Sequence, residues 1–222
     1  MKHLLKTLAA AAIASAGLAP VQAWALPTLE LSSGATTLTI ADGDALDSNA
    51  LAGAVTFIGT VGNFFLNVST GATKPTLGSA AFPDIDLNSV NSSSAAGTLT
   101  IKFSETDYTG ASKLKSDVGG TTQGEVSFEV YADATNALFG LGTQIADLGP
   151  FNGGAFSGVS GGVNAPSAPY SLTQIATIVH GGGQNTTSFD LQTTVPVPAT
   201  LGLLGVGLVG LGWLGRRRTA AA

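Results

Sequence analysis

Apolar and polar residues alternate along the middle of the chain, from about residue 28 to residue 194. In "TLTIKFS" and "GEVSFEVYA", every second residue is apolar and the residues between are polar or charged. A period of two is typical of a β-strand with one buried and one solvent-facing side. In "FFLNVS" the second phenylalanine, Phe65, interrupts the polar face. The buried positions that the pattern predicts are Leu38, Ile40, Phe64, Leu66, Val68, Leu99, Ile101, Phe103, Val126, Phe128, Val130, Phe189 and Leu191.

Segments rich in Gly, Asn, Asp, Pro and Ser separate these runs, among them "ADGDALDSN", "NSSSAAG", "DVGGTTQG" and "HGGGQN". Such segments are typical of turns, and no run between them has the spacing of an amphipathic helix. Many short strands joined by turns predict an all-β fold, specifically an antiparallel β-sandwich of jelly-roll or Ig-like type.

Two stretches fit the alternation poorly. In "SLTQIATIVH" the apolar residues Leu172 and Ile175 are out of phase, which predicts a bulge or kink. The segment "GPFNGGAFSGVSGGVNAPSAP" fits either an irregular strand pair or a flexible glycine loop, and its composition favours the loop.

Residues 1–25 have the three parts of a secretory signal peptide. Two lysines precede a short apolar run, residues 8–18, which is too short to span a bilayer comfortably. Ala23 and Ala25 supply the small side chains that signal peptidase requires at positions −3 and −1. We expect the mature chain to begin at Leu26, and the alternative is an uncleaved N-terminal anchor.

The last segment, residues 195–222, combines a proline motif, an apolar stretch and a basic cluster. Its parts are the motif Val195, Pro196, Val197 and Pro198, the uncharged residues 199–215, and the arginines Arg216, Arg217 and Arg218. Seventeen helical residues span about 25 Å, close to the thickness of the hydrocarbon core. The stretch therefore predicts a transmembrane helix. By the positive-inside rule the arginines stay in the cytoplasm, and residues 26–194 lie outside.

This order of motif, apolar helix and arginine cluster resembles the PEP-CTERM sorting signal of Gram-negative bacteria. The usual motif of that family is Val-Pro-Glu-Pro. Here Val197 replaces the glutamate, so the tail is closer to the related Val-Pro-Leu-Pro-Ala variant. The resemblance implies that an integral-membrane exosortase recognises the motif and removes the tail. A permanent tail anchor is the alternative.

The body, residues 26–194, resembles a recurring β-rich domain of uncharacterised PEP-CTERM proteins. The stretches that carry this resemblance are "LAGAVTFIGTVGNFFLNVSTG", "DLNSVNSSSAAGTLTIKFSETDYTG", "NALFGLGT" and "PYSLTQIATIVHGG". The resemblance implies a surface or matrix protein and supplies no catalytic residues.

Charge narrows the range of partners. Residues 26–194 hold four lysines and all 14 acidic residues, a formal charge of −10. Such a body lacks the basic face that nucleic acid binding requires. The chain has no cysteine, so an exported fold must be held by its core and not by disulfides.

Asp42, Asp44 and Asp47 in "DGDALDSN" are a weak calcium candidate, because carboxylates supply the oxygen ligands that Ca²⁺ prefers. The favoured alternative is a polar turn in which these aspartates bend and cap the chain. A single histidine, His180, and no cysteine in the mature chain argue against zinc. We expect no cofactor.

Two sequence patterns resemble catalytic motifs, but the residues around them do not match those motifs. Ser160 lies in a G-x-S-x-G match and His180 begins an oxyanion-like H-G-G-G, but no acidic residue lies between them. Asp84 and Asp86 could suggest a glycosidase pair, yet their alternation with apolar residues favours the solvent face of an edge strand. The sequence therefore predicts no catalytic residue and a protein that is not an enzyme.

Together these features predict an exported protein with a structural or interaction role. It would reside transiently in the inner membrane and then reach the cell surface, outer membrane or extracellular matrix. Its expected partners are signal peptidase, an exosortase-type enzyme, the membrane and exopolysaccharide. The alternatives are a permanently tail-anchored protein and a carbohydrate-binding adhesin module. The adhesin would need exposed aromatic residues, and Tyr108, Tyr131, Tyr170 and exposed phenylalanines are those available in the body.

Overall fold

The computed structural model describes residues 26–196, and this part of the chain is all-β. Its 11 strands are β1 (Thr28–Ser33), β2 (Thr36–Ala41), β3 (Ala54–Val61), β4 (Phe64–Ala72), β5 (Asp84–Ser93), β6 (Gly97–Tyr108), β7 (Lys113–Asp133), β8 (Thr143–Val159), β9 (Val163–Asn164), β10 (Tyr170–His180) and β11 (Asn185–Thr194). Within the same residues, no helix is long and apolar enough to cross a membrane.

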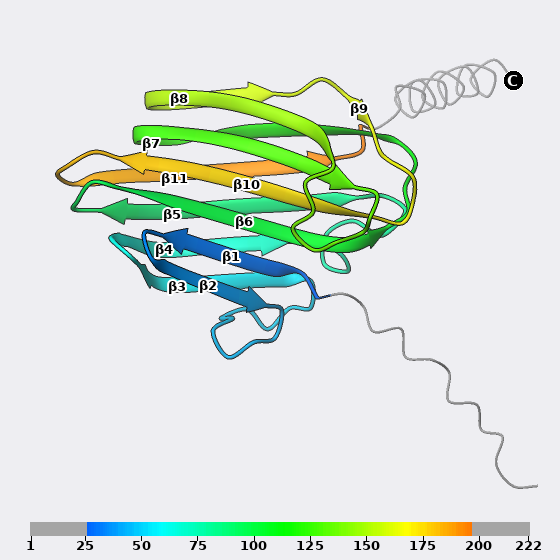
Figure 1. Ribbon diagram of the computed structural model, residues 1–222, viewed down its shortest axis with the longest axis horizontal. Coiled ribbons are helices and arrows are strands. Elements are labelled where there is room, and N and C mark those ends of the chain that lie inside the picture. Colours follow the sequence, from blue (N-terminus) through cyan, green and yellow to red (C-terminus); the bar gives the residue numbers. More distant parts are fainter. Residues whose placement is uncertain (1–25, 197–222) are drawn as a thin grey trace, which may run out of the picture.

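The strands form two facing antiparallel layers (Figure 1). One layer has the order β2-β1-β6-β10, the other has the order β3-β4-β5-β11, and β7 joins them. Residues 115–122 of β7 pair with β11, and residues 125–133 pair with β10. β8 pairs with β7 in both layers. The β7–β8 hairpin therefore closes one side of the structure, which confirms the predicted antiparallel sandwich.

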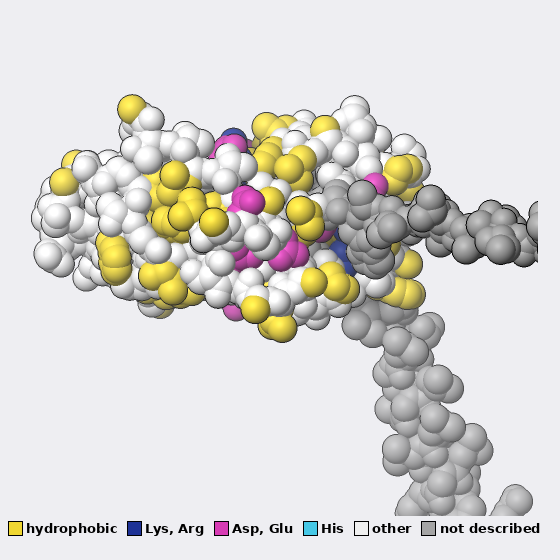
Figure 2. Space-filling model, turned by 90° about the horizontal axis from the view of Figure 1, so that it is seen from below, with side chains coloured by type: hydrophobic (Ala, Val, Ile, Leu, Met, Phe, Trp, Pro, Cys, Tyr) yellow, Lys and Arg dark blue, Asp and Glu magenta, His cyan; other side chains and the backbone are white. Residues whose placement is uncertain are grey.

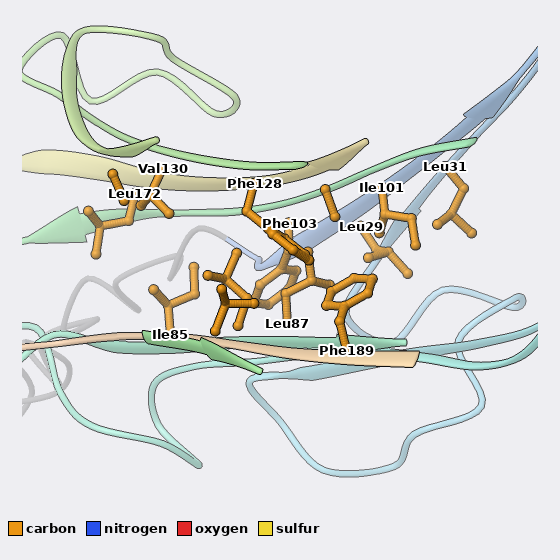
Figure 3. Close-up of a cluster of buried hydrophobic side chains, with 14 of the residues drawn as sticks. Leu29, Leu31, Ile85, Leu87, Ile101, Phe103, Phe128, Val130, Leu172 and Phe189 are labelled. Atoms are coloured by element: carbon orange, nitrogen blue, oxygen red, sulfur yellow. The ribbon is translucent and has the colours of Figure 1, made fainter. Parts of the chain in front are cut away.

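The core lies between the two layers, where side chains from one layer meet those of the other (Figure 3). Nearly every position that the alternation predicts to be buried is buried. The exceptions are Leu38 and Val68, which are half-buried. A register shift between Leu66 and Val68 moves Val68 out of the inward phase and brings Ser69 into the core. Side-chain alternation thus predicts the core well, except where a bulge changes its phase.

β10 carries the predicted irregularity, but it lies at the start of the strand. The register with β6 shifts between Tyr170 and Leu172. Ile175 is out of phase for a different reason, because Gln174 takes the inward position. The Gln174 amide nitrogen lies within hydrogen-bonding distance of three acceptors on the opposite layer, Ile85 O at 3.1 Å, Leu191 O at 3.1 Å and Thr193 Oγ1 at 3.0 Å. A polar side chain therefore links the two layers.

The glycine-rich segment after residue 148 is not a flexible loop, so that expectation is wrong. Most of it belongs to β8, which is paired with β7, and to the short β9. Phe151 and Phe156 stack with ring centroids 4.8 Å apart, and both rings lie near Phe128. Positive φ angles of 63° and 80° at Gly153 and Gly154 bend the strand where it passes between layers. Backbone pairing with β7 and the packing of the phenylalanine rings therefore hold this segment in a strand despite its glycine content.

The sandwich has two different ends, which we call the proximal and distal ends. The distal end carries the short turns at residues 34–35, 62–63, 94–96 and 181–184. The proximal end carries the longer loops 42–53, 73–83, 109–112, 134–142 and 160–169, the start of β1 and the end of β11. Hydrogen bonds connect these loops: Thr76 Oγ1 to Ala52 O (2.7 Å), Thr109 N to Ala80 O (2.7 Å) and Asp107 N to Asn136 Oδ1 (2.8 Å).

Candidate functional site

The calcium candidates Asp42, Asp44 and Asp47 organise the loop between β2 and β3. Each carboxylate accepts hydrogen bonds from backbone amides, at distances between 2.7 and 3.0 Å. The donors are Ala41, Gly43, Asn49, Gly53 and Thr56. Acidic side chains gather in the middle of the face that carries this loop (Figure 2). Within residues 26–196, no group of three His, Cys, Asp or Glu side chains is placed to hold a metal ion. The geometry fits a polar turn.

Asp84 and Asp86 lie on the outer face of β5. This strand runs between β4 and β11, so the expectation of an edge strand is wrong. Burial and the neighbouring carboxyl of Asp190 on β11 raise the pKa of Asp86 to about 7. Burial also raises the pKa of Asp84, whose Oδ1 accepts a bond of 3.1 Å from Gln192 Nε2. Burial is the main cause of the shift at Asp86, and the neighbouring carboxyl adds to it.

Ser160 and His180 lie at opposite ends of the sandwich. Ser160 follows β8 at the proximal end, where its Oγ accepts a bond of 2.8 Å from Ser116 N. His180 is the last residue of β10, at the distal end. The structure therefore does not bring these two residues together.

Two residues of the predicted sorting motif lie in the described part of the chain. Val195 directly follows β11 and packs against the core, and Pro196 is exposed. Val197, Pro198 and the arginines 216–218 lie outside the described residues, as do the predicted signal peptide 1–25 with Ala23 and Ala25 and the predicted transmembrane segment 199–215. The fold therefore reaches the motif with no linker in between.

Phe65 lines an open depression at the distal end. Its side chain is 46% exposed on the outer face of β4, between its ladder partners Thr60 on β3 and Ser92 on β5. With Asn63 and Gln184 these residues line a volume of about 230 Å³. No charged side chain lines it. The depression thus offers one aromatic ring among hydroxyl and amide groups.

A second depression adjoins the first. It has a volume of about 510 Å³ and is lined by the β1–β2 turn, Gly62, Asn63 and residues 96–98, again without a charged side chain. Asn63 belongs to both linings, and its Nδ2 donates a bond of 3.2 Å to Ala96 O. The distal end therefore presents two neighbouring polar, uncharged hollows with a common wall.

A buried chain of hydrogen bonds ends at the Phe65 depression. Ser93, which also lines the depression, bonds His180 Nδ1 at 2.8 Å, and His180 Nε2 bonds Thr187 Oγ1 at 2.8 Å. Thr187 bonds Thr122 Oγ1 at 2.7 Å, which also accepts from Gly124 N at 3.1 Å. Either direction of donation along this chain satisfies both ring nitrogens, and the tautomer of His180 sets the direction. Burial lowers the pKa of His180, so the ring is neutral at pH 7.

The proximal end contains a buried ion pair. Lys74 and Glu105 are 4% and 1% exposed, with 3.2 Å between Nζ and Oε1. Lys74 Nζ also donates to Thr106 O at 2.8 Å and lies 4.8 Å from the centre of the Tyr108 ring. Burial raises the pKa of Glu105 to about 7 against the opposing effect of Lys74. These contacts tie the 73–83 loop to the end of β6.

Sequence reasoning missed both the ion pair and the Phe65 depression. Lys74 and Glu105 are 31 positions apart, and nothing in an alternation pattern indicates that two charged residues pair inside a core. Phe65 did carry a signal, because it interrupts the polar face of its strand. Tyr108 and Tyr170, by contrast, are fully buried.

Comparison with known proteins links the chain to one established motif and to loosely similar folds. No curated protein sequence matches it. The solved structure of TmCBM61 in complex with β-1,4-galactotriose has 6% identity and a TM-score of 0.36, covering 57% of this chain and 87% of that one. The enzymatically active domain of tailspike protein 4 of bacteriophage CBA120 has 8% identity and a TM-score of 0.26, covering 72% and 19%.

The C-terminal segment gives a specific match. Residues 194–218 match the PEP-CTERM protein-sorting motif, which is a signal of exported proteins that an exosortase processes. The match begins at the last residue of β11 and ends at Arg218. It therefore includes all three features on which the resemblance rested, and the chain carries a PEP-CTERM protein-sorting motif at residues 194–218.

Proposed function

We propose that residues 26–194 form a non-catalytic surface or matrix domain, delivered by the signal peptide and released from its tail by an exosortase. The domain reaches the cell surface or the extracellular matrix and acts there through structural or binding contacts. Signal peptidase is its first processing partner, and exopolysaccharide is the surrounding material.

The observation that carries this proposal is the position of the fold between the two processing regions. β1 begins at Thr28, two residues after the expected mature N-terminus, and β11 ends at Thr194, one residue before the motif. Removal of both terminal segments would leave every strand of the sandwich intact. This arrangement supports a domain that functions after processing.

The burial of two titratable groups, His180 and Glu105, supports a non-catalytic role. His180 is buried between two hydroxyls, and Glu105 is buried against Lys74. Neither side chain is free to exchange protons with a substrate, whereas a general acid or base must reach the reacting group. The proposal therefore assigns these groups to stability.

The test is the intact mass of the protein recovered from the surface and medium of the producing cells. The expected species begins at Leu26 and ends close to Pro198. A species that retains Arg216–Arg218 and occurs only in the inner membrane would show a permanent tail anchor instead. Replacing Pro198 with Ala should reduce processing, while V197E, which restores the usual motif, should not.

A further inference from the structure

We propose that the distal end binds a neutral oligosaccharide, with a sugar ring stacked on Phe65. This inference deepens the proposed function and rests on it, because a matrix domain meets polysaccharide. The site lies at the distal end, whereas β11 ends at the proximal end, one residue before the sorting motif. The proposed ligand site and the start of the sorting motif are therefore at opposite ends of the sandwich.

The aromatic ring provides the apolar contact. Phe64 points into the core and packs 5.0 Å from the ring of His180, so the backbone at this position is fixed. Phe65, the next residue, consequently points outward and is 46% exposed. An exposed ring that the fold holds in place can cover the apolar face of a pyranose without ordering cost in a loop.

The polar groups around Phe65 match the hydroxyls of a sugar. Thr60 and Ser92 flank the ring in the ladder, and Asn63 and Gln184 add two side-chain amides. Hydroxyl and amide groups both donate and accept hydrogen bonds, as sugar hydroxyls do. Binding sites commonly combine an apolar wall with a few such oriented groups.

The absence of charged side chains from the site favours a neutral ligand. Neither depression has a charged side chain in its lining. A carboxylate or ammonium group on the ligand would lose hydration there without gaining a partner. The body also carries 14 acidic residues, which would repel an anionic polysaccharide at longer range. The ligand class is therefore uncharged saccharide.

The buried hydrogen-bond chain from Thr122 through Thr187 and His180 to Ser93, which we call the distal relay, adjoins the site, and the second depression extends it. Ser93, 6% exposed, ends the hydrogen-bond chain from Thr122 and is part of the lining of the first depression. Asn63 leads from the first depression into the second. Together the two hollows can accommodate more than one sugar unit, so an oligosaccharide should bind more tightly than a monosaccharide.

The test is calorimetric titration of the full chain in mild detergent with neutral gluco-, galacto-, manno- and xylo-oligosaccharides. Oligogalacturonate and oligoglucosamine serve as the anionic and cationic comparison. We expect saturable binding of at least one neutral oligosaccharide and a loss of at least tenfold in affinity in F65A. F65W should retain binding. F82A is the matched control, because Phe82 is a 70% exposed phenylalanine in the proximal 73–83 loop, and its affinity should equal that of the wild type.

Three results would overturn the proposal: binding of no neutral oligosaccharide, equal affinity of F65A and the wild type, or tighter binding of a charged oligosaccharide. Processing is measured separately by intact mass. A correctly processed protein that binds none of the sugars would refute the saccharide site and leave the sorting role intact. An unprocessed protein that binds a neutral oligosaccharide through Phe65 would refute the sorting role and leave the saccharide site intact.

Discussion

The proximal and distal ends of the sandwich both bury titratable side chains, but they balance them differently. At the proximal end Glu105 meets Lys74, a charged partner, among long loops that must be held together. At the distal end His180 meets only the hydroxyls of Ser93 and Thr187. An ion pair fixes geometry strongly but requires both charges. A hydroxyl network stays neutral, which suits a surface that receives an uncharged ligand.

Loss of one charge at the proximal end should have the largest effect. Lys74→Met leaves the Glu105 carboxylate buried without its partner, and the free energy of unfolding should fall by about 3–5 kcal/mol. Denaturant unfolding of the variant and the wild type measures this loss of stability. Lys102→Met is the matched control, because its pair with Glu30 is partly exposed and should contribute less than about 1 kcal/mol. Equal losses in the two variants would contradict the special status of the buried pair.

The two ends should respond to pH in opposite directions. The pKa of Glu105 is about 7 in the folded state against 4.5 for an ordinary glutamate, so the native state binds more protons between these values. Stability from this group is complete below pH 4.5 and is lost as the pH rises toward 7, by at most about 3 kcal/mol. The pKa of His180 is lowered, so its effect is the reverse, and stability is lost as the pH falls below 6.5.

Denaturant unfolding from pH 4 to pH 8 separates these contributions. Glu105→Gln should flatten the loss between pH 4.5 and pH 7. It should not abolish that loss, because Asp86 contributes with the same sign. His180→Asn should flatten the acid side only. A Glu105→Gln profile parallel to that of the wild type would refute the assignment.

Removing one hydroxyl from the distal relay should have a smaller effect. Thr187→Val keeps the shape of the side chain but deprives His180 and Thr122 of a hydrogen-bond partner. The cost of leaving such buried groups unpaired is about 1–3 kcal/mol. The adjacent Thr186 is exposed, and Thr186→Val should change stability by less than about 0.5 kcal/mol. If both variants behave alike, the relay has no energetic role.

The smallest effect is expected from Ca²⁺ at the proximal loop. The carboxylates of Asp42, Asp44 and Asp47 already accept backbone amide bonds, so millimolar Ca²⁺ should leave Tm where Mg²⁺ leaves it. Thermal unfolding with each ion checks this. A rise in Tm specific to Ca²⁺ and absent in Asp47→Asn would restore the calcium interpretation.

The sequence was sufficient for the architecture and the sorting motif, and insufficient for the features that distinguish the two ends. Alternation predicts inward positions such as Phe103 and Phe128 because burial on one face imposes a period of two. It cannot predict Gln174 facing inward, because that depends on carbonyls of the opposite layer. Glycine content misled for β8, because pairing with β7 decides its conformation. Phe65 was noticed as an exception, but only the ladder showed its polar neighbours.

The place of β11 determines how the molecule bears tension. This strand ends at the sorting motif and is paired along its length with β5 on one side and along residues 187–194 with β7 on the other. A pull between the C-terminal end and a ligand held at the distal end acts along the strand direction. Two hydrogen-bond ladders then resist in shear, so that many bonds must yield together. Residue 194 is thus a mechanically strong point at which to hold this sandwich.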